Sequence, residues 1–353
     1  LFVSGPSALE YVFGAKTIEQ ASRPYAGLAR QGVRVVKAEA QAIDPVRKTV
    51  TTTAGAFAYT TLVLASGIRL APEEIEGLGG AEANLTPWDR AHLPELRRRI
   101  ESLSGGTAVI GVPVGALKCP PGPYEYALLL ARHFARRGRQ GRVVLIDSWP
   151  IPQSVSVAPG FQAAIESFGE RIEYVPQARV ARVDAAARKV LTADGDEFDY
   201  ELLSLIPPNR AWGLVKDLGL AAAGDAFVDV EPLTQRSRRF ETLYAVGDVA
   251  RAPFGKSASA AANAGLLAAR AIVRTLGSRE GADGAARIQV ACYPFVEGFE
   301  RSLAIETDFA LTPRAGADAV LDMKLSADPQ PSEGSAAKRR AWESATLKAA
   351  FAA

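Results

Sequence analysis

The residues with the clearest chemical potential lie in the run from Cys119 to Glu125, which reads Cys-Pro-Pro-Gly-Pro-Tyr-Glu. Proline is tolerated in the first turn of a helix but not deeper, so this run predicts a helix that begins near Pro123 and ends near Arg137. A thiol at a helix N-terminus faces unpaired backbone N–H groups and the positive end of the helix dipole, and both stabilise the reactive thiolate. The pattern therefore favours redox chemistry at Cys119 over a buried, inert cysteine.

Two charged residues flank this cysteine. Glu125 lies one turn into the predicted helix, where its carboxyl group could take up or release a proton. Lys118 comes directly before the cysteine, and its positive charge would favour the thiolate, although it could equally be a solvated surface lysine. The other cysteine of the chain is Cys292. Two cysteines allow either one disulfide or two free thiols, and their number does not decide between these. It does not indicate the cellular compartment either.

A second set of candidate residues lies at the end of a predicted strand. Residues 242–248 read as an apolar strand that ends in Gly247 and Asp248, and an alanine-rich helix follows at residues 257–276. A glycine at a strand end lets a ligand approach the backbone, and the N-terminus of the next helix can hold a pyrophosphate. Asp248 could accept a hydrogen bond from a ribityl hydroxyl, or it could simply cap a helix.

An earlier strand ends in the same way. Residues 61–65 read as an apolar strand, and Ala65, Ser66 and Gly67 close it. Two strand ends of this kind in one chain favour a flavin site over two unrelated turns. The candidate cofactor contacts are Ala40, Ala65, Ser66, Gly67, Gly247, Asp248, Lys256 and Ser257.

The composition argues against several classes of protein. A length of 353 residues is too great for one core and predicts two or three domains. A formal charge of +2, with no basic run interleaved with aromatic residues, argues against nucleic-acid binding. No segment has the apolar length of a membrane span, and the first residues lack the pattern of a signal peptide. His92 and His133 have no metal-ligand spacing and are expected to be structural, near a helix start and on a helix face.

The chain contains an internal repeat with a period of about 140 residues. Its first copy reads as an apolar strand, a turn at Asp44-Pro45 and two further strands, and the second copy repeats this order. The matched order and spacing favour a duplicated unit over two hairpins that are similar by chance. The strands expected are residues 33–36, 48–53 and 61–65 in the first copy, and residues 172–175, 188–191 and 202–206 in the second.

The second copy is preceded by the front of a nucleotide-binding unit. An apolar strand at residues 107–110, the helix after Cys119 and a strand at residues 142–146 form a βαβ unit, and Asp147 follows its second strand. This is the layout of a dinucleotide-binding fold. Its loop contains Gly111 and Gly115 but does not spell G-x-G-x-x-G, so a nicotinamide cofactor is not expected in this half.

These patterns predict an α/β protein with two Rossmann-like dinucleotide-binding domains and a small C-terminal α+β domain. The repeat period would place the opening βαβ unit of the first copy before Leu1, so that start is expected to be missing from the chain. Near the C-terminus we expect strands at residues 302–307 and 319–324, a charged loop at 327–336 and a helix at 337–352. The predicted domains are residues 1–75 with 218–290, which would hold the flavin, residues 76–217, and residues 291–353.

Several peptides, in order, resemble those of a known family: the flavoprotein subunit of flavocytochrome c sulfide dehydrogenase, within the sulfide:quinone oxidoreductase and pyridine nucleotide disulfide reductase superfamily. Residues 118–125 are similar to the family's segment around its first redox cysteine, and residues 291–293 to the segment around its second. Residues 205–211 resemble the segment that closes the middle domain, and residues 244–248 with 256–257 resemble the second flavin motif. The resemblance covers nearly the whole chain and implies a fold like that of glutathione reductase.

The resemblance also implies the chemistry. In that family the two redox cysteines form a disulfide beside the flavin, so the match implies a Cys119–Cys292 bridge that hydrosulfide would open. It implies FAD as cofactor, Glu125 as a proton relay, a cytochrome c haem subunit as the partner that takes the electrons, and a periplasmic location. The family often holds its flavin covalently through a cysteine. Gly5 stands at that position here, so any flavin is expected to be non-covalent.

Two other functions stay open on the sequence alone. A flavin-free relative could keep the fold and the disulfide but act as a binding or scaffold subunit, because the glycine-rich phosphate loop of the first copy is not in the chain. The other alternative is a sulfide:quinone oxidoreductase, although such relatives use more cysteines and an amphipathic C-terminal anchor. The last helix here carries Lys338, Arg339, Arg340 and Glu343 and lacks a wide apolar face. Trp342 on the same helix is expected to pack in the core or at an interface.

Overall fold

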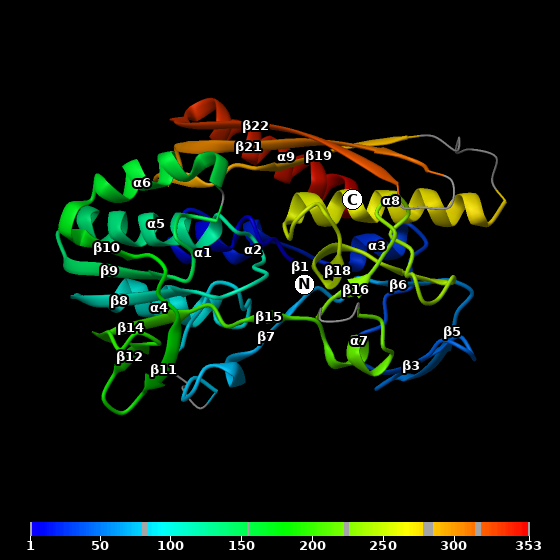
Figure 1. Cartoon of the computed structure of the whole chain (residues 1–353), viewed down its shortest axis with the longest axis horizontal. Coiled ribbons are helices and arrows are strands. Elements are labelled where there is room, and N and C mark those ends of the chain that lie inside the picture. Colours follow the sequence, from blue (N-terminus) through cyan, green and yellow to red (C-terminus); the bar gives the residue numbers. More distant parts are fainter. Residues whose placement is uncertain are drawn as a thin grey trace.

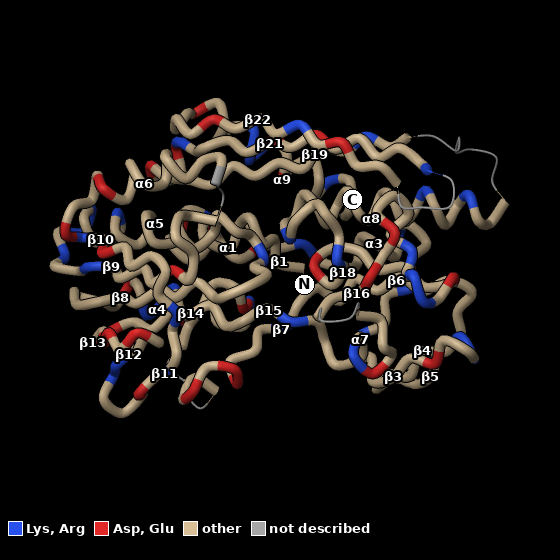
Figure 2. The backbone as a smooth tube through the Cα atoms, viewed as in Figure 1, with Lys and Arg blue, Asp and Glu red and all other residues tan. Residues whose placement is uncertain are grey.

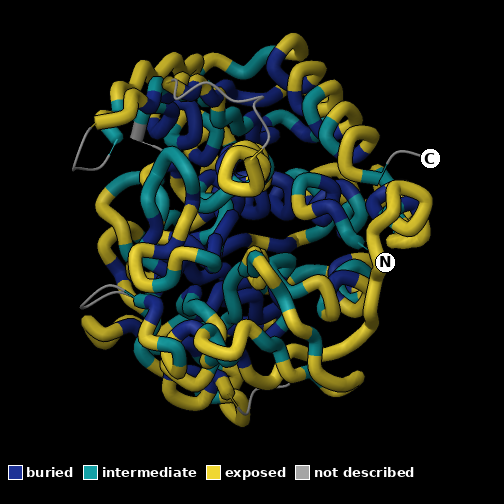
Figure 3. Tube along the Cα trace, turned by 90° about the vertical axis from the view of Figure 1, so that its right-hand side faces the viewer, coloured by how far each residue is buried: buried dark blue, intermediate teal, exposed yellow. Residues whose placement is uncertain are grey.

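The computed structural model describes residues 2–79, 84–153, 155–221, 226–277, 285–314 and 319–351. Two α/β halves lie side by side, and a long antiparallel sheet lies across both of them (Figure 1). The chain passes between the halves at β7 (Arg69–Leu70) and returns at β15 (Asn209–Arg210), and these two short strands pair with each other. Buried segments gather in the interior and exposed ones form the outside (Figure 3).

One half is built on a parallel sheet in the strand order β10-β9-β8-β14. Successive side chains of a strand point to opposite faces of the sheet. Ile110 and Leu145 therefore pack against helices on one face, whereas Val109 and Val144 pack against antiparallel strands on the other. Because both faces are covered, these strands read as nearly continuous apolar runs. They are β8 (Gly105–Val112), β9 (Gln140–Asp147), β10 (Ile172–Val175) and β14 (Leu202–Leu205).

Three helices contribute to the core on the first of these faces: α4 (Leu93–Ser102), α5 (Gly122–Arg136) and α6 (Ala158–Glu166). Helix α5 begins one residue before the expected position, and Pro123 lies in its first turn as the proline rule requires. His92 caps α4 and His133 lies on α5, where burial lowers the pKa of its imidazole to about 4. Both positions match the expected ones, at a helix start and on a helix face.

The internal repeat appears as two antiparallel sheets of three strands each. Asp44 and Asp184 occupy equivalent turns, and each accepts a hydrogen bond from the backbone N–H three residues later, at 2.8 and 2.9 Å. Lys48 and Arg188 close these turns in the left-handed region, with φ of 51° and 55°. The same turn in both copies confirms the duplication. The strands are β3 (Ala40–Asp44), β4 (Thr49–Thr52) and β5 (Gly55–Ala58), and β11 (Val180–Asp184), β12 (Lys189–Thr192) and β13 (Glu197–Asp199).

The other half is centred on two parallel strands, β6 (Leu62–Leu64) and β17 (Leu243–Ala245). The long helix α8 (Ala258–Thr275) packs its buried alanines against Tyr244 and Val246, at the end of β17. Shorter elements complete this half: α7 (Gly213–Asp217), β16 (Val228–Asp229) and β18 (Ala250–Arg251).

The strand expected at residues 33–36 is wrong, because these residues adopt no strand in the structure. Its counterpart in the second copy, β10, is held by parallel pairing with β9. Within the described part of the chain no strand pairs with residues 33–36, and Val33 and Val35 are each 46% exposed. Apolar periodicity alone does not make a strand when no neighbouring strand supplies its hydrogen bonds.

The sheet that lies across both halves consists of β19 (Ala286–Cys292), β20 (Phe295–Glu297), β21 (Arg301–Thr312) and β22 (Val320–Ser332). The loop expected at residues 327–336 is wrong, because β22 continues until Ser332 pairs with Ser302 and helix α9 (Glu333–Phe351) follows directly. Most side chains of β22 are exposed, so its sequence is polar like that of a loop. As an edge strand it also tolerates Pro329 and Pro331.

The N-terminal segment lies between the two halves and α9 (Figure 1). Lys and Arg residues alternate with Asp and Glu residues over both halves (Figure 2). Among the described residues, no helix combines the length and the apolar character needed to cross a membrane. The elements of the N-terminal segment are β1 (Phe2–Val3), α1 (Ala8–Val12), α2 (Ile18–Ala21), β2 (Ser22–Arg23) and α3 (Ala26–Arg30).

Candidate active site

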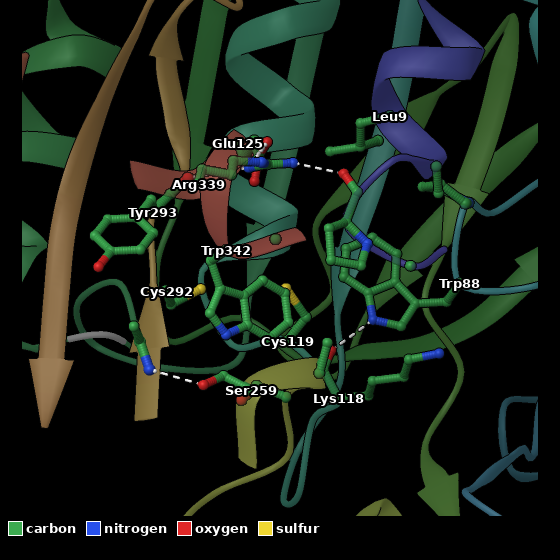
Figure 4. Close-up of a pocket in the computed structure, with 18 residues that line it drawn as sticks. Leu9, Trp88, Lys118, Cys119, Glu125, Ser259, Cys292, Tyr293, Arg339 and Trp342 are labelled. Atoms are coloured by element: carbon green, nitrogen blue, oxygen red, sulfur yellow. Dashed lines mark hydrogen bonds and ion pairs between the residues drawn. The ribbon is translucent and has the colours of Figure 1, made fainter. Parts of the chain in front are cut away.

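The two cysteines line one cavity of about 140 Å³ (Figure 4). Cys119 lies in the loop before α5, and Cys292 is the last residue of β19. Both are free thiols, and each influences the titration of the other. The structure therefore brings together the pair that the sequence resemblance implied, without a bond between the sulfurs.

The backbone holds the Cys119 sulfur in a constrained position. Cys119 has a φ of 59°, in the left-handed region that residues other than glycine seldom adopt. Its N–H donates to the Lys256 carbonyl at 2.7 Å, and its carbonyl accepts from the Gly122 N–H at 2.9 Å. A β-carbon at Gly122 would lie 3.2 Å from the Cys119 sulfur and 2.9 Å from the Trp88 ring. Only glycine fits between these two groups.

The position of Cys292 is fixed from α8. The Ser259 hydroxyl accepts a hydrogen bond from the Ala291 N–H at 3.0 Å, next to Cys292 (Figure 4). Asn263, one turn further along α8, donates to the Gln289 carbonyl at 2.9 Å. These contacts join the edge of β19 to α8, so Asn263 serves the packing of the two elements.

The two thiols have pKa values displaced in opposite directions. A hydrogen bond from the Cys292 thiol lowers the pKa of Cys119, with smaller help from Arg339 and Lys118 and against the effects of burial and Glu125. The same hydrogen bond and burial raise the pKa of Cys292 well above its ordinary value. Cys119 is therefore the more acidic thiol of the pair. The sequence attributed its acidity to the helix N-terminus, whereas the partner thiol contributes most to it.

Glu125 lies on the cavity wall and forms a buried ion pair with Arg339 at 2.7 Å. Burial raises the pKa of Glu125, and the neighbouring guanidinium opposes part of that effect. Arg339 comes from α9, 214 residues further along the chain. Sequence reasoning placed it on a charged helix without a role. The one hint in the sequence was that Arg339 and Glu343 are spaced one helical turn apart and so share a face of the helix. In the structure both residues are buried.

Two tryptophans and a lysine complete the cavity wall. The Trp88 indole N–H donates to the Lys118 carbonyl at 2.7 Å, and the Lys118 side chain lines the cavity (Figure 4). Trp342 also lines the cavity, one turn after Arg339 on α9. Its expected role in core or interface packing stays a prediction, and its place on the cavity wall puts that face of α9 near the cysteines.

The two predicted strand ends lie next to each other. Leu64 pairs with Ala245 in the parallel pair β6–β17, so the residues that follow each strand emerge at the same edge. Gly67 and Gly247 both adopt left-handed φ values, 65° and 71°, which only glycine accepts without strain. A β-carbon at Gly247 would lie 3.2 Å from that of Ala261 on α8.

Asp248 has an unused acceptor at this edge. Its Oδ1 atom is buried and has no hydrogen-bond partner among the described residues. Burial raises the pKa of its carboxyl group, while Lys118 and Lys256 oppose the shift. Asp248 does not cap α8, because Ser257 is the N-cap residue and its hydroxyl accepts from the Ala260 N–H at 3.1 Å. A buried carboxylate oxygen without a partner is what a ligand hydroxyl would satisfy.

The other predicted cofactor contacts lie in different surroundings. Ser257 lines the cavity. The Lys256 ammonium donates to the backbone carbonyls of Asp248 at 2.6 Å and Ala250 at 3.1 Å and so supports the loop. Ala40, Ala65 and Ser66 are exposed and lie outside the cavity wall.

The acidic residue of the middle unit is occupied within the protein. Asp147 Oδ2 accepts hydrogen bonds from the hydroxyls of Tyr124 at 2.7 Å and Tyr174 at 2.8 Å, and Oδ1 accepts from the Trp149 N–H at 3.0 Å. Asp147 is fully buried, and burial raises its pKa. In a dinucleotide-binding domain this carboxylate would hold a ribose. Here it fastens β9 to α5 and β10.

Comparisons with known proteins agree with this geometry. Residues 94–207 match the family model for the central region of the sulfide dehydrogenase [flavocytochrome c] flavoprotein chain. The mitochondrial sulfide:quinone oxidoreductase of Mus musculus is 24% identical over 314 residues, 85% of this chain and 68% of that protein. The sulfide-quinone reductase of Aquifex aeolicus is 32% identical over 143 residues, 39% of this chain and 32% of that protein. The crystal structure of the sulfide:quinone oxidoreductase from Aquifex aeolicus has a TM-score of 0.74 at 20% identity, covering 98% of this chain and 82% of that one.

The likeness to solved structures shows the fold, a mixed α/β architecture with two Rossmann-like units. The match over residues 94–207 and the similarity to sulfide:quinone oxidoreductases agree with the family resemblance found in the sequence.

Proposed function

We propose that this protein is a flavoprotein oxidoreductase that oxidises sulfide, or a related reduced sulfur compound, through Cys119 and Cys292. The observation that carries the proposal is the meeting of both cysteines, Glu125 and the N-terminus of α8 around one cavity, although they come from distant segments. The match to the sulfide dehydrogenase family and the named activity of the curated relatives support the same substrate.

FAD is the cofactor that this family implies, and several residues fit it. Asp248 offers a buried acceptor without a partner among the described residues, and Gly67 and Gly247 leave the backbone open at neighbouring strand ends. Ser257 caps the helix whose N-terminus meets the cavity. Gly5 lines the cavity and offers no side chain for a covalent link, so the flavin would be held non-covalently. When bound, the flavin would accept the electron pair that the thiol chemistry releases.

The cysteines would act as a disulfide that sulfide opens. Hydrosulfide attacks one sulfur of a Cys119–Cys292 bond, the sulfur–sulfur bond breaks, and the products are a persulfide on the attacked cysteine and a thiolate on the other. The sulfur whose thiolate is stabilised by nearby positive charge is the better leaving group, and both Arg339 and Lys118 lower the pKa of Cys119. The attack is therefore expected at Cys292, with Cys119 leaving as the thiolate.

Glu125 is placed to handle the proton of the persulfide. It lines the cavity that holds both sulfurs, and burial raises the pKa of its carboxyl group above the ordinary range. A carboxyl group whose pKa moves toward neutrality can accept a proton and release it again within one catalytic cycle. Lys118 would supply positive charge near the arriving hydrosulfide.

Two electron acceptors have support. The family model that matches residues 94–207 comes from a flavocytochrome c, which favours a cytochrome c partner. The periplasmic location that the sequence resemblance implies remains part of this proposal. The curated relatives are sulfide:quinone oxidoreductases, which favours a quinone. We propose cytochrome c as the acceptor and retain a quinone as the second candidate.

Purified protein reconstituted with FAD should show flavin absorption bands that bleach within seconds of adding sulfide under anaerobic conditions. Either horse cytochrome c or decylubiquinone, added afterwards, should restore the bands, and the acceptor that does so faster identifies the partner class. A flavoprotein that binds FAD, is reduced by dithionite and stays yellow with millimolar sulfide would contradict sulfide oxidation. A protein that binds no FAD would instead favour the scaffold function.

Asp248→Asn should weaken FAD binding by about ten- to a hundredfold, the loss expected for one hydrogen bond to a charged group. The same change should raise the melting temperature of the flavin-free protein, because it removes the charge of a partly buried carboxylate whose Oδ1 atom has no hydrogen-bond partner among the described residues. Fluorescence titration with FAD and thermal denaturation measure the two effects. Asp217→Asn, at an exposed position on α7, is the matched control. Equal FAD affinity in the Asp248 variant and wild type would exclude Asp248 from the flavin site.

A further inference from the structure

Arg339 connects three segments at the cavity. Its Nη1 donates to Glu125 Oε1 at 2.7 Å and to the Tyr293 carbonyl at 3.0 Å, and its Nη2 donates to the Pro6 carbonyl at 2.6 Å. The guanidinium carbon lies 4.1 Å from the centre of the Phe295 ring. Arg339 thus holds α5, the residue after Cys292 and the N-terminal segment in one arrangement.

The charge of Arg339 is buried together with the reacting groups. Arg339 is 8% exposed and Glu125 is 4% exposed, and both line the cavity that contains the two sulfurs. A charge in such surroundings is tolerated only when it is paired and hydrogen-bonded. The Nε atom of Arg339 is also buried, and within the described part of the chain it has no partner. The fold therefore leaves one donor of this cation unused.

Most elements packed around Arg339 contribute a titratable or charged group, whereas the Pro6 segment contributes a backbone carbonyl and β20 the Phe295 ring. Negative or acidic groups outnumber the cations near it, so the guanidinium is the main positive charge that faces both the carboxylate and the thiols. These groups are Glu125 on α5, Glu10 on α1, Cys119 and Lys118 before α5, Cys292 on β19, and Glu343 on α9 with its partner Lys16.

We infer that Arg339 is a positioning residue for the thiol chemistry: it fixes the Glu125 carboxylate beside the cysteine pair and balances the negative charge that forms when a thiolate is released. This inference rests on the proposed function, because it assigns Arg339 a task at the same cysteine pair. The inference requires that removing Arg339 and removing Glu125 shift the pKa of Cys119 in opposite directions, because Arg339 stabilises the thiolate and Glu125 disfavours it.

The test is the pH profile of thiol alkylation in the reduced full-length protein, measured by mass spectrometry with iodoacetamide and without sulfide or an electron acceptor. Arg339→Gln should move the midpoint for Cys119 to higher pH by about 1 or more, the effect of losing one nearby opposite charge. Glu125→Gln should move it to lower pH, and Arg339→Lys should stay close to wild type. Arg340→Gln is the matched control, because that exposed neighbour contacts only the Phe299 carbonyl among the described residues.

Shifts in the same direction for Arg339→Gln and Glu125→Gln, or no shift in either, would overturn the inference and leave Arg339 a structural role only. If Arg339→Gln alone does not fold, the comparison of Glu125→Gln with Glu125→Gln/Arg339→Gln isolates the same cation. Removing Arg339 in that background should again raise the midpoint, and an unchanged midpoint would refute the charge effect. Because no sulfide is present, failure of sulfide oxidation in wild type would not alter these outcomes.

Discussion

Cys119→Ser and Cys292→Ser should each reduce the rate of flavin reduction by sulfide by about a thousandfold or more, because neither variant can form the disulfide that sulfide opens. A Cys292→Ala variant should also change the remaining thiol. Its residue 292 has no side-chain donor, so Cys119 loses the hydrogen bond that contributes most to its low pKa, and its alkylation should need a higher pH than in reduced wild type. Stopped-flow absorbance of the flavin and alkylation kinetics measure the two effects.

The control for this prediction is FAD binding. Both serine variants should bind FAD with wild-type affinity and be reduced fully by dithionite, because exchanging sulfur for oxygen changes the side-chain volume little. The chain has no other cysteine that could replace the missing thiol. A variant that keeps more than about a tenth of the wild-type rate would show that sulfide delivers its electrons without the cysteine pair.

The parts of the site that sequence reasoning found are those governed by local rules. The prolines around Cys119 determine where α5 begins, and they place Glu125 in its first turn. Gly67 and Gly247 end two strands that belong to one parallel pair, so their closeness follows from the topology of an α/β fold. In each case the information lies within a few residues of the functional group or in a regular sheet.

The parts that were missed depend on contacts between distant segments. Arg339 and Trp342 belong to a helix with few large apolar residues, which therefore resembled a solvated surface helix. Its buried face contains Arg339 and Glu343, which are held by ion pairs and hydrogen bonds, and periodicity of apolar residues does not detect such a face. The partner of Arg339 lies 214 residues away, and no local pattern announces that pairing.

The two errors in the fold have a related cause. Residues 33–36 have the composition of a strand but no strand beside them in the described part of the chain, whereas β22 has the composition of a loop but pairs with β21 along its length. Strand formation depends on an available neighbour as well as on the sequence of the strand itself. Composition therefore predicted the buried central strands correctly and failed at these two places.

Helix α9 is attached to the N-terminal segment by buried charged groups, and removing one of them should change the free energy of unfolding strongly. Glu343 accepts hydrogen bonds from the hydroxyls of Ser4 and Ser7, the latter at 2.6 Å, and pairs with Lys16 at 2.9 Å. Lys16 also pairs with Glu10 at 2.8 Å. Glu343 is 5% exposed, so these polar groups satisfy one another with little water. The cluster fastens the helix that carries Arg339 and Trp342 to the N-terminal segment.

Glu343→Ala should therefore lower the free energy of unfolding by about 2–4 kcal/mol at neutral pH, because it removes the acceptor of two buried hydroxyls, Ser4 and Ser7, and one of the two carboxylates paired with Lys16. Burial alone would raise the pKa of Glu343, but the bonds from Ser4, Ser7 and Lys16 together hold it below the ordinary value of 4.5. A carboxyl group with a lowered pKa stabilises the fold fully above that ordinary value and loses its contribution as the pH falls through the folded-state pKa.

The stability difference between wild type and Glu343→Ala should consequently be largest above about pH 5 and shrink at lower pH, as followed by urea denaturation across a pH series. Glu333→Ala is the matched control, because Glu333 is an exposed glutamate in the first turn of the same helix and its removal should cost less than about 1 kcal/mol. If both variants lost the same small amount of stability, α9 would be held by its few apolar contacts, and the buried charges would not be what positions Arg339 and Trp342 at the cysteine pair.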